Sequence, residues 1–185
     1  MKLAYILFND MTLLDLIGAY DALNRLKTMN YIPDFKWDLI ALTEKVSDES
    51  GITLLPTKTG GSLESYDAVF VPGGDGHGPL LHDNNFIAWL QTATPAAWKI
   101  SVCTGSLLLG AAGFLKDKEA TTHFDYYEPL QQYCKTVVID RVVEDGNIIT
   151  AGAVSSSIDL GLFLCQKWAG AEAAASIRRR MDYRG

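Results

Sequence analysis

The chain has 185 residues, of which 48% are hydrophobic and 21% are charged, and it carries a formal net charge of −6 at pH 7. This length suits a single domain over residues 1–185 that buries its own core, and the composition is that of a folded rather than a disordered chain. The acidic balance argues against a nucleic-acid partner, because contact with a phosphate backbone usually needs a basic face.

The predicted elements alternate between strands and helices from the start of the chain. A nearly continuous apolar run over residues 2–8 predicts a buried strand, and apolar residues at helical spacing predict a helix over residues 13–27. Further strands are expected over residues 35–42, 51–55 and 68–71, the last of which ends at Pro72-Gly73-Gly74.

The alternation continues through the second half of the chain. We expect a helix over residues 79–93, a strand over 99–102, a helix over 104–112, a strand over 120–122 and a helix over 125–133. Strands over residues 137–143 and 147–151 flank Asp145-Gly146, which is a strong hairpin signal. A last helical region runs over residues 155–180 with a break at Gly170. This order predicts an α/β fold with a mostly parallel sheet covered by helices and one small β-hairpin.

The three cysteines, Cys103, Cys134 and Cys165, lie far apart in the sequence. An odd number without close spacing is not a disulfide framework and indicates a reducing compartment. The apolar run at the N-terminus is too short for a signal peptide, and the longest apolar stretch is too short to cross a bilayer. We therefore expect a cytoplasmic protein with no membrane partner. Cys165 lies in an apolar helical stripe and is expected in the core.

Cys103 lies where a predicted strand stops and a predicted helix starts. It follows Ile100-Ser101-Val102 and precedes the small residues Thr104-Gly105-Ser106. Such a turn places a side chain at the carboxyl end of a parallel strand, where open α/β sheets bind ligands. The adjacent helix N-terminus favours the thiolate form, and its free N–H groups can hold a developing negative charge. Cys103 is therefore a candidate nucleophile; the alternative is a buried structural cysteine.

Asp15 is flanked by apolar residues at the start of the first predicted helix. A carboxyl in such a position is a candidate acid or base, because burial raises its pKa. The segment Thr12-Leu13-Leu14-Asp15 also has the form of a capping box, in which Asp15 would have a structural role instead. The residues alone leave both interpretations open.

Other polar and glycine positions are weaker candidates. His123 is either a base that activates Cys103 through space or a hydrogen-bonded structural histidine. His77 and His82 are five residues apart and do not share a helix face, so we expect no metal site. Gly73 and Gly74 either form a tight turn or let the backbone approach a substrate, with N–H groups that complete an oxyanion hole.

Two glycine patterns fall short of nucleotide-binding motifs. Gly105 and Gly110 have P-loop spacing, but Ala111 stands where the motif needs lysine. The glycines at 74, 76 and 78 are followed by Pro79 where the dinucleotide fingerprint needs its third glycine. We therefore expect no nucleotide cofactor.

Four segments spread over nearly the whole chain resemble the ThiJ/PfpI superfamily. They are residues 8–23 with Asp15, Val71-Pro72-Gly73-Gly74, residues 101–106 around Cys103, and Ala120-Thr121-Thr122-His123. Within that superfamily the chain looks most like the isocyanide (isonitrile) hydratases, although the N-terminal domains of AraC-type regulators carry the same motif. The resemblance implies a flavodoxin-like three-layer sandwich with helices on both faces of the sheet, and usually a homodimer.

The resemblance also assigns roles to residues of the chain. It implies that Cys103 is the nucleophile on a strained elbow and that Asp15 is the acidic residue hydrogen-bonded to its sulfur. Cys103 followed by Thr104 matches the hydratases, which implies hydration of an isocyanide to an N-substituted formamide. That reaction would pass through a thioimidate on Cys103 with Asp15 as acid and base. Backbone groups of Gly73, Gly74 and Thr104 would bind the small-molecule substrate, and no metal or organic cofactor is needed.

Two other functions remain as alternatives. Protease- and glyoxalase-like members often carry histidine after the cysteine, where this chain has Thr104, so peptidase activity is not expected. A thiol can still add to small carbonyl compounds in glyoxalase- or amidase-like chemistry. The domain could instead be a ligand or oxidation sensor without catalysis. Residues 151–157 hold fewer glycines than the hydratases lead us to expect, which leaves the pocket wall and the substrate open.

Overall fold

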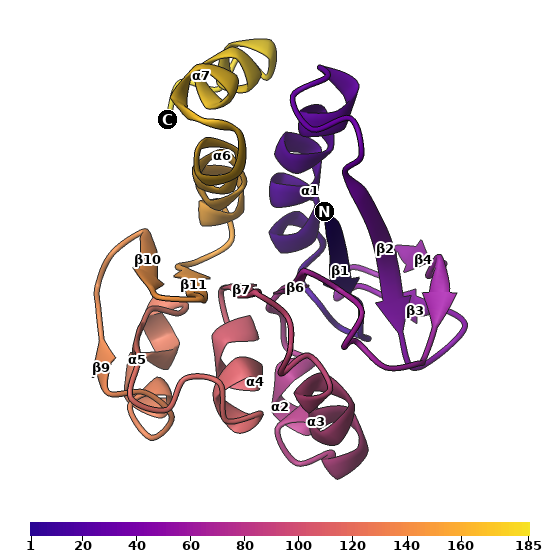
Figure 1. Cartoon of the computed structure of the whole chain (residues 1–185). Coiled ribbons are helices and arrows are strands. Elements are labelled where there is room, and N and C mark those ends of the chain that lie inside the picture. Colours follow the sequence, from indigo (N-terminus) through magenta and orange to yellow (C-terminus); the bar gives the residue numbers. More distant parts are fainter.

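The computed structural model describes residues 1–185 and is built around a seven-stranded sheet (Figure 1). The strands of this sheet are β1 (Lys2–Ile6), β2 (Lys36–Ala41), β5 (Lys58–Thr59), β6 (Ala68–Val71), β7 (Trp98–Val102), β10 (Val142–Asp145) and β11 (Ile148–Ala151). They lie in the order β10-β11-β7-β6-β1-β2-β5, and all neighbours are parallel except β10 and β11. The chain order reverses between β1 and β6, so the carboxyl ends of these strands flank a crevice of the kind that binds ligands.

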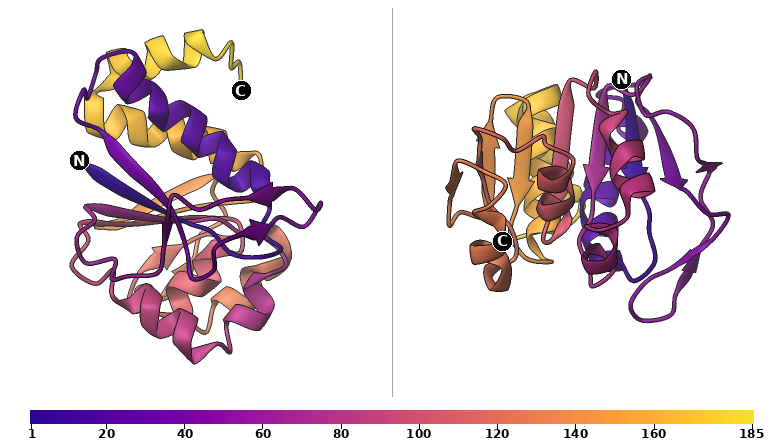
Figure 2. Two further views of the ribbon diagram at one scale, coloured as in Figure 1. Left: turned by 90° about the vertical axis from the view of Figure 1, so that its right-hand side faces the viewer. Right: turned by 90° about the horizontal axis from the view of Figure 1, so that it is seen from below.

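Helices cover both faces of the sheet (Figure 2). One layer contains α1 (Leu13–Thr28), α6 (Ser156–Ala169) and α7 (Ala171–Arg180). The other layer contains α2 (His77–Leu80), α3 (Asn84–Gln91), α4 (Gly105–Ala111) and α5 (Tyr127–Leu130). The predicted mostly parallel three-layer α/β fold is confirmed. None of these helices combines the length and the apolar character needed to cross a membrane.

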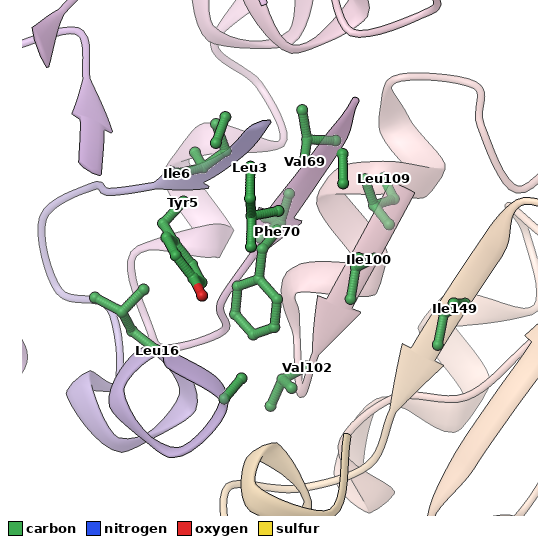
Figure 3. Close-up of a cluster of buried hydrophobic side chains, with 14 of the residues drawn as sticks. Leu3, Tyr5, Ile6, Leu16, Val69, Phe70, Ile100, Val102, Leu109 and Ile149 are labelled. Atoms are coloured by element: carbon green, nitrogen blue, oxygen red, sulfur yellow. The ribbon is translucent and has the colours of Figure 1, made fainter. Parts of the chain in front are cut away.

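The core between the sheet and α1 contains large aromatic side chains from adjacent strands (Figure 3). Tyr5 of β1 and Phe70 of β6 are fully buried, and their ring centroids are 5.5 Å apart. Leu16 of α1 is also fully buried in this cluster. Burial of apolar area stabilises such contacts by roughly 25 cal/mol per Å². This packing fixes the first turn of α1 against the sheet, and it thereby fixes the position of Asp15, which precedes Leu16.

Two predicted helices are wrong in their extent. The helix expected over residues 79–93 is divided into α2 and α3, because the Asp83 side chain caps a new helix by accepting the N–H groups of Asn85 and Phe86. The helix expected over residues 125–133 is replaced by a 3₁₀ turn (Phe124–Tyr126) followed by the short α5. The break at Gly170 is confirmed, and this residue has a φ of 89° between α6 and α7.

The short strands also differ from the expectation. Only Thr53–Leu54 (β4) of the segment 51–55 is a strand, and it pairs with Val46–Ser47 (β3) outside the main sheet. The strand expected over residues 137–143 is divided into β9 (Thr136–Val137) and β10. β9 pairs with Glu119–Ala120 (β8), outside the main sheet. The hairpin at Asp145-Gly146 is confirmed, with a φ of 65° at Gly146.

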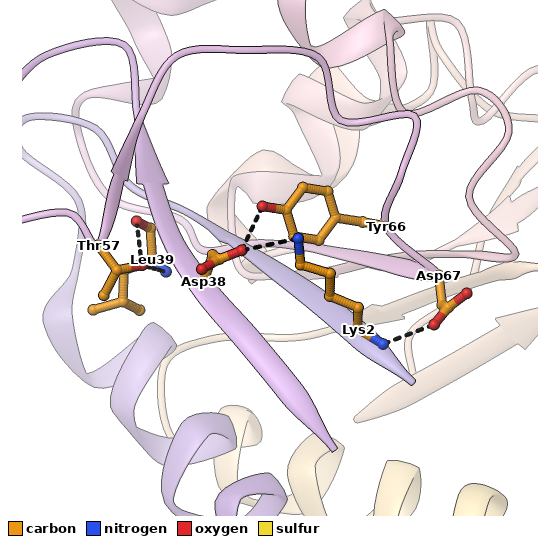
Figure 4. Close-up of polar contacts among 6 residues, drawn as sticks. All are labelled: Lys2, Asp38, Leu39, Thr57, Tyr66 and Asp67. Atoms are coloured by element: carbon orange, nitrogen blue, oxygen red, sulfur yellow. Dashed lines mark hydrogen bonds and ion pairs between the residues drawn. The ribbon is translucent and has the colours of Figure 1, made fainter. Parts of the chain in front are cut away.

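Polar contacts join β1, β2 and the segment before β6 (Figure 4). The Tyr66 hydroxyl donates to Asp38 Oδ2 at 2.6 Å, and Lys2 Nζ lies 3.3 Å from the same oxygen. The backbone N–H of Lys2 donates to Asp67 Oδ2 at 2.7 Å. These contacts hold the amino end of β1, and the carboxyl end of the same strand leads to α1.

Candidate active site

Cys103 lies in the turn between β7, which ends at Val102, and α4, which begins at Gly105. Its φ is 55°, in the left-handed region that residues with a Cβ rarely adopt. Holding a side-chain-bearing residue there costs about 1 to 3 kcal/mol. The residue is only 4% exposed. The predicted strand-to-helix turn is therefore present, and its backbone is strained at the cysteine.

Hydrogen bonds to both the N–H and the carbonyl oxygen hold the backbone of Cys103 in this conformation. Its N–H donates to the carbonyl oxygens of Ala151 (3.0 Å), the last residue of β11, and of Gly152 (2.9 Å), which follows it. Its carbonyl oxygen accepts the hydroxyl of Thr122 at 2.9 Å and the hydroxyl of Ser106 at 3.1 Å. Both side chains are buried. The strain at Cys103 is thus supported by contacts from three other segments of the chain.

Asp15 belongs to the first turn of α1 and is fully buried. Its Oδ2 accepts the backbone N–H of Gly73 at 2.9 Å, whereas Oδ1 has no hydrogen-bond partner. The thiol lies next to this carboxyl, close enough for each group to affect the ionisation of the other. The structure therefore brings Asp15 and Cys103 close together, whereas the hydrogen bond between them that the resemblance implied stays a prediction.

The capping-box interpretation of Asp15 is wrong. Its carboxyl points to Gly73, and the backbone N–H of Thr12, which a capping box would satisfy, donates to the Gly73 carbonyl oxygen at 2.8 Å. The Thr12 hydroxyl donates instead to Glu49 Oε2 at 3.1 Å. The loop after β6 thus occupies the place that a cap would fill.

Burial dominates the ionisation of both groups. Loss of solvation raises the pKa of Asp15 to about 7; the Gly73 N–H and the Cys103 thiol oppose this rise, and the charge of Glu49 adds to it. Burial also raises the pKa of Cys103 to about 12, and the negative charge of Asp15 adds to that rise. Near neutral pH the Cys103 thiol therefore keeps its proton, and Asp15 is partly protonated.

The expected stabilisation of a thiolate at rest is wrong for this site. The backbone N–H groups of Thr104 and Val154 and the Thr104 hydroxyl do lower the pKa of Cys103. Burial and the adjacent carboxyl outweigh them, because taking a charge out of water costs more than a few partial positive charges return.

The loop after β6 approaches Cys103 very closely. A Cβ on Gly73 would lie 2.7 Å from the Cβ of Cys103 and 2.7 Å from the backbone nitrogen of Thr104. Gly74 has a φ of 121°, and its N–H donates to Thr104 Oγ1 at 3.0 Å. The N–H groups of both glycines therefore already hold side chains of the protein. The oxyanion role of Gly73, Gly74 and Thr104 stays a prediction.

A cavity of about 240 Å³ opens above Cys103. Its lining comes from the start of α1, the loops after β3, β6 and β7, the 3₁₀ turn and the segment before α6: Thr12, Glu49, Gly74, Asp75, Cys103, Thr104, His123, Asp125, Tyr126 and Val154. This size suits a small molecule that reaches the sulfur.

His123 lines this cavity, but it makes no hydrogen bond to Cys103 or Asp15. Its Nδ1 accepts the backbone N–H of Asp125 at 3.2 Å, and its ring stacks on Phe124 with centroids 4.2 Å apart. These contacts fit the structural interpretation of His123. His77 Nδ1 is 2.8 Å from the Gly74 carbonyl oxygen, and nowhere do three His, Cys, Asp or Glu side chains gather as metal ligands.

The other two cysteines lie away from the cavity, and all three are free. Cys165 is fully buried and its sulfur lies 3.5 Å from the Ala22 carbonyl oxygen, so its expected core role is confirmed. Cys134 is half-buried, and its thiol donates to the Leu130 carbonyl oxygen.

Several contributors to the site had no role assigned from the sequence. Thr122 and Ser106 belong to the motif, but only the structure shows that their hydroxyls donate to the Cys103 carbonyl oxygen. Val154, whose N–H faces the sulfur, and Glu49, at the cavity mouth, carried no local signal. Their roles depend on contacts between segments far apart in the chain.

Comparison with known proteins identifies the family of this chain. The DJ-1/PfpI family matches residues 1–167. The chain belongs to the DJ-1/PfpI family. It is 38% identical over 184 residues to an isonitrile hydratase of Pseudomonas putida, and the aligned region covers 99% of this chain and 78% of that protein.

Solved structures of DJ-1/PfpI proteins superpose on the whole chain. A ThiJ/PfpI family protein from Pseudomonas syringae matches with a TM-score of 0.91 at 28% identity, over 100% of this chain and 75% of that one. DJ-1β of Drosophila melanogaster matches with a TM-score of 0.85 at 20% identity, over 100% of this chain and 98% of that one. The second likeness concerns the fold alone, and it agrees with the flavodoxin-like expectation.

Proposed function

We propose that this protein hydrates a small isocyanide to an N-substituted formamide through Cys103 and Asp15. The observation that carries the proposal is a buried thiol that lines a cavity, next to a buried carboxyl that has one oxygen without a hydrogen-bond partner. The similarity to a protein named isonitrile hydratase points to the same electrophile. A terminal isocyanide carbon is small enough to reach the sulfur of Cys103, a residue that is only 4% exposed.

In the first step Asp15 takes the proton of the Cys103 thiol, and the sulfur forms a bond to the terminal carbon of the isocyanide. Asp15 then gives that proton to the same carbon, which yields a thioimidate, R–N=CH–S. The pKa of Asp15, near 7, suits a group that must accept and return a proton at neutral pH. The N–H groups of Thr104 and Val154 face the sulfur and stabilise its negative charge while it lasts.

In the second step water adds to the thioimidate, with its oxygen bonding to carbon and one proton going to nitrogen. The carbon–sulfur bond then breaks, its electron pair returns to sulfur, and the hydroxyl proton returns to the thiol through Asp15. The net reaction consumes one water and gives R–NH–CHO. The reaction needs no redox step.

The test is turnover of an uncharged aliphatic isocyanide, with the formamide proton followed by NMR. We expect turnover by the native protein, none by Cys103→Ala, and unchanged turnover by Cys134→Ser, since Cys134 lies outside the cavity. Native protein that converts none of a range of alkyl and aryl isocyanides would refute the proposal. Parallel assays for lactate from methylglyoxal separate this reaction from glyoxalase-like chemistry.

We also propose that the protein acts as a homodimer. The family resemblance implies it, and two large apolar side chains on α1, Leu14 and Ile17, are 47% and 41% exposed. Light scattering coupled to size-exclusion chromatography should give twice the monomer mass of 20.3 kDa, and a monomer at micromolar concentration would contradict it.

A further inference from the structure

The mouth of the Cys103 cavity is lined by acidic side chains and by no lysine or arginine. Glu49, Asp75 and Asp125 all line it, and all three are exposed. They come from three separate segments, namely the loop after β3, the loop after β6 and the 3₁₀ turn. Because they surround one small opening, their fields add there instead of cancelling.

No cation of the protein neutralises these carboxylates. Glu49 accepts only the Thr12 hydroxyl, and Asp125 lies 3.6 Å from Nδ1 of His123, which accepts the backbone N–H of Asp125. Arg141 reaches the start of α6, where it donates to Ser155, but its guanidinium is paired with Asp159. The charge of the mouth therefore remains available to a ligand.

The same cavity offers further features that fit a cation. The ring of Tyr126 lines it and is held edge-on against the His77 ring, with centroids 4.9 Å apart. Aromatic faces attract ammonium groups. Cys103 lines the inner end of the cavity, with the fully buried Asp15 carboxyl next to it, and this marks where the reactive end of a ligand belongs. The reactive groups and the three carboxylates therefore lie at different parts of one cavity.

We propose that this cavity selects small substrates that carry a positive charge, such as an ammonium group, on the end that faces the mouth. This inference rests on the proposed function for the identity of the reacting carbon. The reactive end enters towards Cys103, and the cationic end stays among Glu49, Asp75 and Asp125. Anionic analogues are disfavoured by the same field.

The first test measures charge selection without relying on isocyanide chemistry. Cys103 is modified with methanethiosulfonate reagents that carry either a trimethylammonium-ethyl or a sulfonate-ethyl group, and each rate is divided by the rate for free β-mercaptoethanol. Peptide mass mapping separates Cys103 from Cys134. We expect the normalised rate of the cationic reagent to be larger on the order of tenfold, and the ratio to shrink as salt is raised.

Variants of the mouth link this ratio to its cause. Glu49→Gln and Asp125→Asn should each lower the cation-to-anion ratio several-fold, and the double variant more. Glu172→Gln, which removes the same charge from α7 outside the cavity, should leave the ratio unchanged. Because the ratio compares two reagents on the same thiol, a change in the ionisation of Cys103 cancels. A ratio near one in the native protein, or one unaffected by the mouth variants, overturns the inference.

The second test compares turnover of trimethylammonioethyl isocyanide with that of its neutral carbon isostere, neohexyl isocyanide. We expect kcat/KM to favour the cation on the order of tenfold, and Glu49→Gln to reduce this preference. Equal turnover overturns the inference and leaves the proposed function intact. If neither isocyanide is converted, the proposed function fails, and the labelling ratio still decides whether the mouth selects cations.

Discussion

Replacing Asp15 with asparagine should make the protein more stable above neutral pH while it abolishes turnover. The carboxyl is fully buried, and burial raises its pKa from 3.8 to about 7. The folded protein therefore holds a proton that the unfolded chain releases between these pH values. Its stability falls as the pH rises through that window, because there the native state binds more protons than the unfolded state.

The size of the effect follows from the two pKa values. They differ by about 3 units, and each unit corresponds to about 1.4 kcal/mol, so ionised Asp15 costs the fold about 4 kcal/mol above pH 8. Below pH 4 the carboxyl is neutral in both states and the cost disappears. Asparagine has nearly the same shape, can still accept the Gly73 N–H, and has no charge to bury.

The assay is urea unfolding of the native protein and of Asp15→Asn at several pH values between 4.5 and 8.5. The variant's advantage in free energy of unfolding should grow by about 3 kcal/mol over this range. Asp21→Asn is the matched control on α1: Asp21 is about half exposed and paired with Arg25, so its loss should cost less than about 1 kcal/mol. If the difference between Asp15→Asn and the native protein is constant with pH, the buried-carboxyl argument is wrong.

Three further predictions concern the same site. The kcat/KM for an uncharged isocyanide should rise with pH through an apparent pKa near 7, because protonated Asp15 cannot accept the thiol proton; a flat profile from pH 5.5 to 9 would exclude this role. Thr122→Val should lower kcat, and it should lower the free energy of unfolding measured in urea by about 1 to 3 kcal/mol, because the Cys103 carbonyl loses a buried donor. Thr122→Ser keeps the hydroxyl and should retain both kcat and stability. Gly73→Ala should lower the melting temperature and block Cys103 labelling, because its Cβ would overlap the turn at Cys103 and Thr104. Gly78→Ala, with no atom within 4 Å of its Cβ, should behave as the native protein. Equal behaviour of the two variants would contradict the close approach of Gly73 to Cys103.

Local patterns were sufficient to predict most of the fold. Continuous apolar runs and helical spacing identified α1, α4, α6 and the central-sheet strands other than β5, because burial on one or both faces dictates residue type at short range. The two-residue edge strand β5 is exposed and carries no such pattern. The same local logic placed Cys103 at the carboxyl end of a strand. It failed for the helix over residues 79–93, where the Asp83 side chain starts a new helix, and for residues 125–133, where only short turns of helix form.

The sequence by itself determined the alternation of elements, the position of the cysteine at a strand end, and the family motif around it. The tertiary structure decided what the cysteine is. It places Asp15 next to Gly73 and Cys103, brings the Thr122 hydroxyl within hydrogen-bond distance of the Cys103 carbonyl, and brings three carboxylates to the lining of one cavity. It also reversed the expected ionisation of the thiol, because desolvation depends on everything packed around a group, whereas a helix N-terminus can be recognised from a few neighbouring residues.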